Sequence, residues 1–213
     1  MSSSHAADLL AQVEKSPAAV AIHDKQAWMA IFAQYHIVED PVGSRPHVSG
    51  IYDRIATQRG NGPLSRFFDT FIEPNQISFD VHRDIVCGNH VVRDLTIHIQ
   101  MSDRVHVQVP MHLLYELVQE SGQWKIVHLA AHWELLPMIF QLLRKGMACL
   151  PVLTALTLRM LKLQGIGGML GFSQAALNIG NAGKKAVHEF EQAFNAGKLA
   201  DLMGVFASDA DIV

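Results

Sequence analysis

The sequence contains little cysteine and no strong excess of charge of either sign. Only two of the 213 residues are cysteines, Cys87 and Cys149. Neither belongs to a C-x-x-C pair, which argues against a disulfide framework and a zinc knuckle. The formal net charge is −3, so the chain lacks the broad basic field that attracts nucleic acid. We therefore expect a reducing environment and no nucleic-acid partner.

Motifs for cofactors, export and membrane spanning are missing too. No G-x-G-x-x-G, P-loop or cysteine ligand set occurs, so no cofactor is expected. The opening MSSSHAADLLAQVEKS has no basic region followed by an apolar core, which predicts a cytoplasmic location without a secretory signal. The longest uncharged apolar run, 146–158, has 13 residues. A helix needs about 20 to span a bilayer.

The hydrophobic periodicity predicts helices followed by a sheet. Helical spacing is found in residues 5–35 and 63–73, with Asp24 as a helix cap before Trp28 and Pro63 near a helix start. Four later segments are rich in β-branched and aromatic residues and are separated by turn residues, so they are predicted strands: 77–86, 90–101, 105–118 and 124–135. Helices before sequential antiparallel strands indicate an α+β fold, with the helices on one face of a curved sheet.

The segment after the strands is strongly apolar, and two interpretations are open. Four basic residues flank or interrupt it, namely Arg144, Lys145, Arg159 and Lys162. The segment either packs as a helical pair on the domain or in a dimer interface, or lies in a membrane interface. The second interpretation predicts peripheral membrane contact through residues 138–170.

The stretch VEDPVGSRPHVSG, residues 38–50, resembles the ketosteroid isomerase family of the nuclear transport factor 2-like superfamily, which includes the SnoaL-like proteins. In that family, two or three helices precede an E-D-P-V-G-S segment and a strongly bent antiparallel sheet follows. The stretch VQVPMHLLYEL, residues 107–117, resembles the family strand that carries V-x-x-P-x-D. The resemblance covers about residues 8–136. It implies a cone-shaped fold in which helices close one side of the sheet around an apolar pocket.

The resemblance gives Asp40 the position of the family's catalytic base. That base takes a proton from the carbon next to a ketone and returns it elsewhere on the same face. By itself, an aspartate before a proline is more often a turn residue. The resemblance of the E-D-P-V-G-S segment to the family favours the interpretation of Asp40 as a catalytic base. Neighbouring side chains on a strand point to opposite faces, so we expect Glu39 to point away from the pocket.

Both oxyanion donors of the family are replaced in this sequence. The family's tyrosine falls on Ser16, and its acidic donor, two residues after Pro110, falls on His112. His112 either donates a ring N–H to the substrate or orients Asp40, or it is simply bonded within the sheet. Tyr115 is expected on the face opposite to that of His112, and hence not as a substitute.

His132 is expected to face the pocket, sharing a face with Ile126, His128 and Ala130. The predicted catalytic residues are therefore Asp40, His112 and His132. No metal site is predicted, because His128 and His132 on one strand would lie about 13 Å apart. The family pattern suggests four apolar residues that line the pocket: Phe32, Ile97, Ile99 and Leu114.

Two further segments follow the expected domain of residues 8–136. Residues 137–180 are expected to be an apolar helical segment. Residues 184–213 resemble the opening of the same family again, through EFEQAFNAGKLADLMGVFASDADIV at 189–213. They are expected to form a helical hairpin, an incomplete second repeat without its own sheet.

The leading function is an isomerase- or cyclase-like activity that abstracts a proton next to a carbonyl of a small hydrophobic, steroid- or polyketide-like molecule. The alternatives are a non-catalytic binder of a hydrophobic ligand, associated with a membrane, and a dimerisation module. The superfamily often pairs subunits through its open sheet face, so a homodimer is expected. Fold alone does not decide between these functions.

Overall fold

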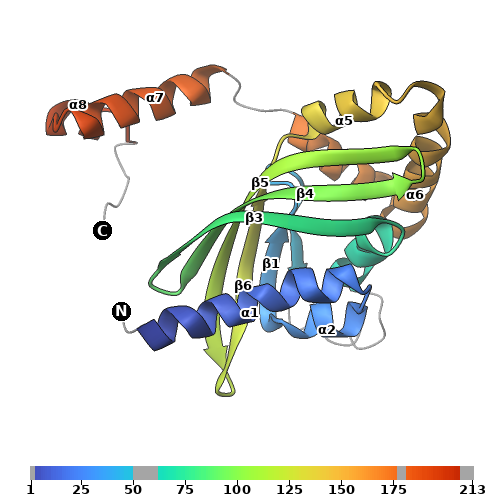
Figure 1. Cartoon of the computed structure of the whole chain (residues 1–213), viewed down its shortest axis with the longest axis horizontal. Coiled ribbons are helices and arrows are strands. Elements are labelled where there is room, and N and C mark those ends of the chain that lie inside the picture. The colour runs from blue at the N-terminus through green and yellow to red at the C-terminus, as the bar shows by residue number, and fades with distance from the viewer. Residues whose placement is uncertain (1–2, 50–61, 177–180, 207–213) are drawn as a thin grey trace. The chain divides into compact units, whose positions relative to one another are not determined.

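The computed structural model describes residues 3–49, 62–176 and 181–206, which belong to two compact units (Figure 1). Unit 1 spans Met1–Ala176 and unit 2 spans Leu177–Val213. Unit 1 contains the whole sheet, and the apolar segment that follows the sheet is part of this unit.

Unit 1 is built on a mixed, open sheet of six strands in the order β2-β1-β6-β5-β4-β3. β1 pairs with β6 in parallel, whereas the other neighbouring strands pair antiparallel. The strands are β1 (Phe32–Glu39), β2 (His47–Ser49), β3 (Gln76–Cys87), β4 (His90–Ser102), β5 (Val105–Glu120) and β6 (Gln123–His132). The predicted α+β fold with a curved sheet is confirmed, while β2 and the parallel pair were not anticipated.

Helices cover one face of this sheet. Those before β3 are α1 (Ser3–Ala21), α2 (Lys25–Ala30), α4 (Pro63–Phe67) and the π-helical turn η2 (Phe68–Ile72). Those after β6 are α5 (Leu135–Leu143), the 3₁₀ turn η3 (Gly146–Ala148), α6 (Cys149–Ser173) and the 3₁₀ turn η4 (Gln174–Ala176). α1 passes in front of β6, and α5 and α6 lie at the other end of the sheet (Figure 1).

Local sequence signals explain where the early helices begin. Asp24 caps α2, because its side chain accepts a hydrogen bond of 2.8 Å from the backbone N–H of Ala27. Pro63 occupies the first turn of α4, where its missing N–H costs nothing. The predicted helix over residues 5–35 is wrong at its end. β1 begins at Phe32, because the carbonyl of Ile31 already accepts a 3.0 Å hydrogen bond from Ile126 on β6.

A buried arginine joins α1 to the sheet. The Arg93 side chain on β4 is 1% exposed, and its guanidinium donates to Asp84 on β3 at 2.8 and 2.9 Å. The same group donates to Glu14 on α1 at 3.0 and 3.1 Å. A buried guanidinium with two carboxylate partners has its hydrogen-bonding needs satisfied. Removing the guanidinium or its partners leaves the remaining charge unpaired, which destabilises the fold.

We predict that Arg93→Met lowers the free energy of unfolding by about 2–4 kcal/mol, because Asp84, which is 23% exposed, loses its partner and the bonds from the buried guanidinium to α1 and β3 are lost. Urea denaturation measures the change. Arg83→Met on β3 is the matched control, since Arg83 is exposed, and its effect should stay within about 0.5 kcal/mol. A loss below about 1 kcal/mol in Arg93→Met would mean that the guanidinium contributes little beyond its packing.

Unit 2, as far as it is described, is a helical hairpin of α7 (Asn181–Asn195) and α8 (Leu199–Met203). Phe190 contacts Phe194 and Phe206 with ring centroids 6.0 and 5.7 Å apart. The hairpin agrees with the helices expected there, whereas its interpretation as a second repeat stays a prediction. Residues 207–213, which carry part of that resemblance, lie outside the described residues.

Candidate active site

The covered face of the sheet encloses an apolar cavity of about 130 Å³. Apolar side chains of β4 and β5 form its floor, and Met138 of α5 with Leu156 and Phe172 of α6 closes one side. Drug-sized ligands usually occupy about 300–1,000 Å³, so this cavity suits a smaller molecule or requires α6 to shift outward. The polar side chains on its wall are Ser16, Asp40, Asn75, Arg93 and Tyr115.

The parallel pairing of β1 with β6 positions Asp40. Val38 and Glu39 of β1 pair with Leu129 and Ala130 of β6, so both strands end at the same edge of the sheet. Asp40 follows β1 and Trp133 follows β6, and the indole Nε1–H donates a 2.7 Å hydrogen bond to Asp40 Oδ1. The carboxyl group therefore has a fixed orientation on the wall of the cavity.

Burial raises the pKa of Asp40 to about 6, and the hydrogen bond from Trp133 opposes this shift only in part. A carboxylate in water has a pKa near 4 and is a weak base. At a pKa near 6, Asp40 is mostly ionised at neutral pH and still basic enough to accept a proton from carbon.

The neighbouring carboxylate has a different environment. Glu39 points to the other face of the sheet, as expected, and its Oε2 lies 2.9 Å from Nε2 of His128. Strand alternation thus separates the two acids of the E-D-P segment. Only Asp40 lies on the wall of the cavity.

A phenol that the sequence analysis set aside lies in the cavity. Tyr115 on β5 is 1% exposed, and its side chain lines the cavity together with Ser16 of α1. Ser16 Oγ in turn accepts a 3.1 Å hydrogen bond from the indole N–H of Trp28. Ser16 can direct its own O–H toward the phenol oxygen, and the phenol O–H is then free to donate a hydrogen bond to a ligand. Burial raises the pKa of Tyr115 well above its ordinary value, so the phenol stays a neutral donor.

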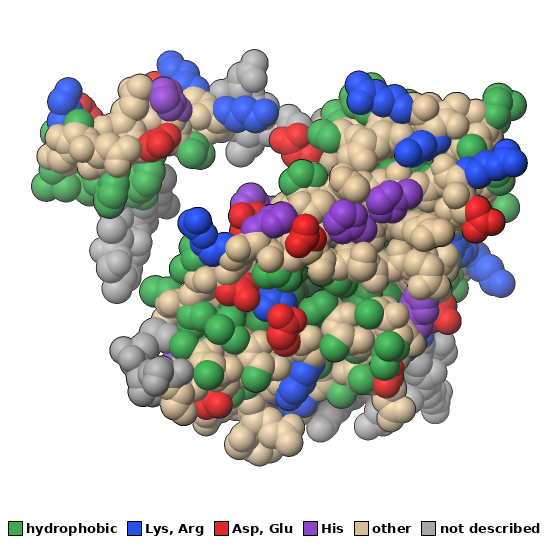
Figure 2. All heavy atoms as spheres, in the orientation of Figure 1, with side chains coloured by type: hydrophobic (Ala, Val, Ile, Leu, Met, Phe, Trp, Pro, Cys, Tyr) green, Lys and Arg blue, Asp and Glu red, His purple; other side chains and the backbone are tan. Residues whose placement is uncertain are grey.

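The two predicted catalytic histidines lie elsewhere. His112 and His132 pair directly across β5 and β6 on the open face of the sheet. The His112 side chain is 64% exposed and its Nε2 lies 3.4 Å from Asp94 Oδ1. His106 lies on the same face of β5 and stacks on His98 of β4, with ring centroids 5.7 Å apart. Figure 2 shows several histidine side chains close together on the molecular surface. The structure does not bring His112 or His132 to Asp40.

Strand irregularity explains the misplacement of His132. The β5–β6 register shifts between Glu116 and Leu117, where one extra β6 residue, Val127, stands between the partners Ile126 and His128. Such a bulge reverses the alternation of faces. Ile126 is buried, but beyond the bulge Leu129 and Trp133 line the cavity while His132 is exposed. The expected orientation of His132 is therefore corrected.

The four predicted lining residues are divided. Ile97 and Ile99 line the cavity. Phe32 is buried in the core against Trp28, with ring centroids 5.1 Å apart. Leu114 points to the open face, and its neighbour Leu113 takes the place on the cavity wall. A role of any of them in ligand binding stays a prediction. Within the described parts of the chain, no group of three or more His, Cys, Asp or Glu residues is placed to hold a metal ion.

Comparisons with known proteins support this fold. No protein-family model matches the sequence, and no curated protein does. A computationally designed 17-OHP binder is 18% identical, with a TM-score of 0.50 over 62% of this chain and 95% of that chain. A Mycobacterium tuberculosis protein in complex with estradiol-17beta-hemisuccinate is 20% identical, with a TM-score of 0.49 over 62% and 96%.

A third similar structure is the Delta 5-3-ketosteroid isomerase from Mycobacterium sp., at 21% identity and a TM-score of 0.46 over 59% of this chain and 92% of that chain. The E-D-P-V-G-S segment predicted this fold, which the chain shares with the designed 17-OHP binder. At these identities the likeness concerns the fold alone, and the chemistry depends on the residues of this chain.

We predict that Asp40 makes the protein less stable as the pH rises. A raised pKa means that the folded state binds the proton more tightly than the unfolded state does. The associated stability is complete below about pH 4 and is lost by about pH 6, with a total of about 3 kcal/mol. Relative to wild type, Asp40→Asn should therefore gain stability between these values.

Urea denaturation at pH 4, 5, 6 and 7 measures this difference. Glu73→Gln at the end of η2 is the control, because Glu73 is exposed and its substitution should leave the pH profile unchanged. Parallel profiles for wild type and Asp40→Asn would show that the Asp40 carboxyl is solvated, contrary to this expectation.

Proposed function

We propose that the protein is an isomerase- or cyclase-like enzyme that abstracts a proton next to the carbonyl group of a small hydrophobic molecule. The observation that carries this proposal is the Asp40 carboxyl, whose pKa burial raises to about 6 in a mostly apolar cavity that also holds a phenol donor. A fold shared with a designed binder of 17-OHP fits a small apolar ligand.

The reaction follows from the two polar groups. Asp40 takes a proton from the carbon beside the carbonyl, and the electron pair of that C–H bond moves toward the carbonyl oxygen. The Tyr115 phenol, which lines the same cavity, donates a hydrogen bond to the oxygen as it becomes negative. Asp40 then returns the proton to another carbon, so the substrate is isomerised and the enzyme is unchanged. In this proposal Tyr115, and not His112 or His132, is the catalytic partner of Asp40.

The isomerisation of cyclohex-3-enone to its conjugated isomer is a direct test, because the probe is small enough for the cavity and the product absorbs ultraviolet light. We expect Asp40→Asn to lower kcat by about 10²–10⁴-fold. Tyr115→Phe should lower it by about 10²–10³-fold, the effect of removing one oxyanion donor. Tyr35→Phe is the control, because Tyr35 is 56% exposed and should leave the rate unchanged.

A non-catalytic binder of a hydrophobic ligand is the second candidate, favoured by the apolar lining and by the absence of the family's own oxyanion residues at Ser16 and His112. The fluorescence of 2-naphthol separates the two candidates. Tight binding of this phenol in wild type, Asp40→Asn and Tyr115→Phe alike, together with no turnover of the ketone, would support the binder. Binding that depends on Asp40 and Tyr115 would support the catalytic arrangement.

We also propose a homodimer, a peripheral membrane contact and a cytoplasmic location. The open face of the sheet, with His98 stacked on His106 at 5.7 Å, is the surface through which a homodimer would form. Peripheral membrane contact through residues 138–170 is proposed as well. By length and composition, the described part of the chain has one helix, Gly146–Ala176, that could cross a membrane. A cytoplasmic location stays a prediction.

A further inference from the structure

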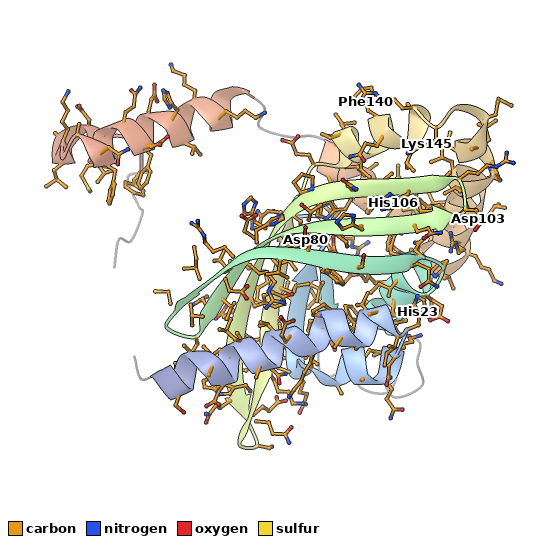
Figure 3. The ribbon with its side chains drawn as sticks, in the orientation of Figure 1. His23, Asp80, Asp103, His106, Phe140 and Lys145 are labelled. Atoms are coloured by element: carbon orange, nitrogen blue, oxygen red, sulfur yellow. The ribbon has the colours of Figure 1, made fainter. Side chains whose placement is uncertain are left out.

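Exposed hydrophobic side chains gather on the outer side of α5, η3 and α6. Phe140 is 61% exposed and points away from the sheet (Figure 3), and Met147 is 80% exposed. On α6, Leu150, Leu158 and Ile166 are 50%, 60% and 67% exposed. Exposed apolar side chains gathered on neighbouring helices mark a place where another phase or molecule is bound. We name these five residues the α5–α6 surface.

The charged residues of α5, η3 and α6 all have one sign. No acidic residue occurs between Glu134 and Glu189 in the sequence. The basic residues Arg144 and Lys145 lie just after α5, and Arg159 and Lys162 lie on α6. Figure 2 shows basic and hydrophobic side chains side by side over these helices. Hydrophobic residues beside basic ones, without acids, complement a layer of anionic lipid headgroups.

The other side of α6 is attached to the domain. Met160 and Cys149 are 5% and 3% exposed, and Leu156 and Phe172 line the cavity. At the end of α6, the carbonyl of Gly171 accepts a 3.1 Å hydrogen bond from the backbone N–H of Arg45. A helix that crossed the bilayer would have to give up these contacts and place Arg159 and Lys162 in hydrocarbon. The arrangement therefore fits a segment lying along the membrane surface as two helical pieces that meet at Gly165, where φ is 71°.

We propose that the α5–α6 surface docks peripherally on bilayers that contain anionic phospholipid. The proposal extends the proposed function, because Met138, Leu156 and Phe172 form the cavity wall on the side of the same helices. Docking would place the outer side of these helices against the lipid, so that the helices alone separate the lipid from the cavity. The partner of the enzyme is then an anionic bilayer, and its substrate is drawn from compounds that dissolve in lipid.

Flotation of the full chain with vesicles tests the docking. With phosphatidylcholine vesicles containing 30% phosphatidylglycerol, we expect binding that 1 M NaCl largely reverses, because salt screens the basic residues. Vesicles of phosphatidylcholine alone should bind at least about tenfold less, given a loss of roughly fivefold per interacting basic residue. Binding that resists both salt and alkaline carbonate would indicate a spanning helix and overturn the proposal.

Two variants and two matched controls locate the surface. Arg144→Glu combined with Lys145→Glu should weaken binding by at least about 25-fold, and Leu158→Asp by at least about tenfold. Ile22→Asp and Arg83→Glu change equally exposed residues outside the surface, Ile22 being 73% exposed, and should bind as wild type does. Equal losses in variants and controls would contradict the assignment of this surface.

Two further outcomes separate the proposal from its alternatives. If wild type is a dimer that fails to float and Leu158→Asp makes it a monomer, then a second copy covers the surface and the proposal is overturned. Asp40→Asn should float as wild type does, whatever its effect on cyclohex-3-enone. Failure of docking with intact enone turnover would thus remove the membrane proposal alone, and docking without turnover would leave it standing.

Discussion

The parallel pairing of β1 with β6 is the constraint on which the rest of the site depends. It joins the first strand of the chain to the last one, so that two side chains 93 residues apart, Asp40 and Trp133, meet at one edge of the sheet. The same pairing holds the following segment, because the Val42 N–H donates a 2.8 Å hydrogen bond to the carbonyl of Ala131. Without this pairing the carboxyl would be a surface acid in a turn, with an ordinary pKa.

Much of the fold could be predicted from local patterns. The alternation in β5 is regular, and Val105, Val107, Val109, Met111, Leu113, Tyr115 and Leu117 are all buried. That alternation alone places Tyr115 on the inner face and His112 on the outer face. The apolar alternation of β5 thus predicts that Tyr115 and His112 lie on opposite faces, as they do. The family resemblance, counted from Pro110, instead assigned the inner face to His112. Regular alternation was the better guide, because burial acts on the strand itself.

Other parts of the site could not be predicted from the sequence. The bulge at Val127 depends on how β6 pairs with β5. The sequence around it contains no glycine or turn residue that would predict a bulge. The β1–β6 pair depends on contacts far apart in the chain, and the hydrophobic residues Ile31 and Phe32 continue a helical spacing that the sheet overrides. In both places pairing between strands decided the structure, whereas the sequence pattern reported only local preference.

The alternation of Glu39 and Asp40 has a consequence for how the site tolerates changes in chain length. One residue inserted ahead of Glu39 would move Glu39 into the place of Asp40, and the cavity would keep a carboxyl group. The new side chain would be longer by one methylene, so its oxygens would reach deeper into the cavity and lose the fixed distance to the Trp133 indole. After a one-residue insertion, the E-D pair would therefore keep a carboxyl group in the cavity, but the position of its oxygens would change.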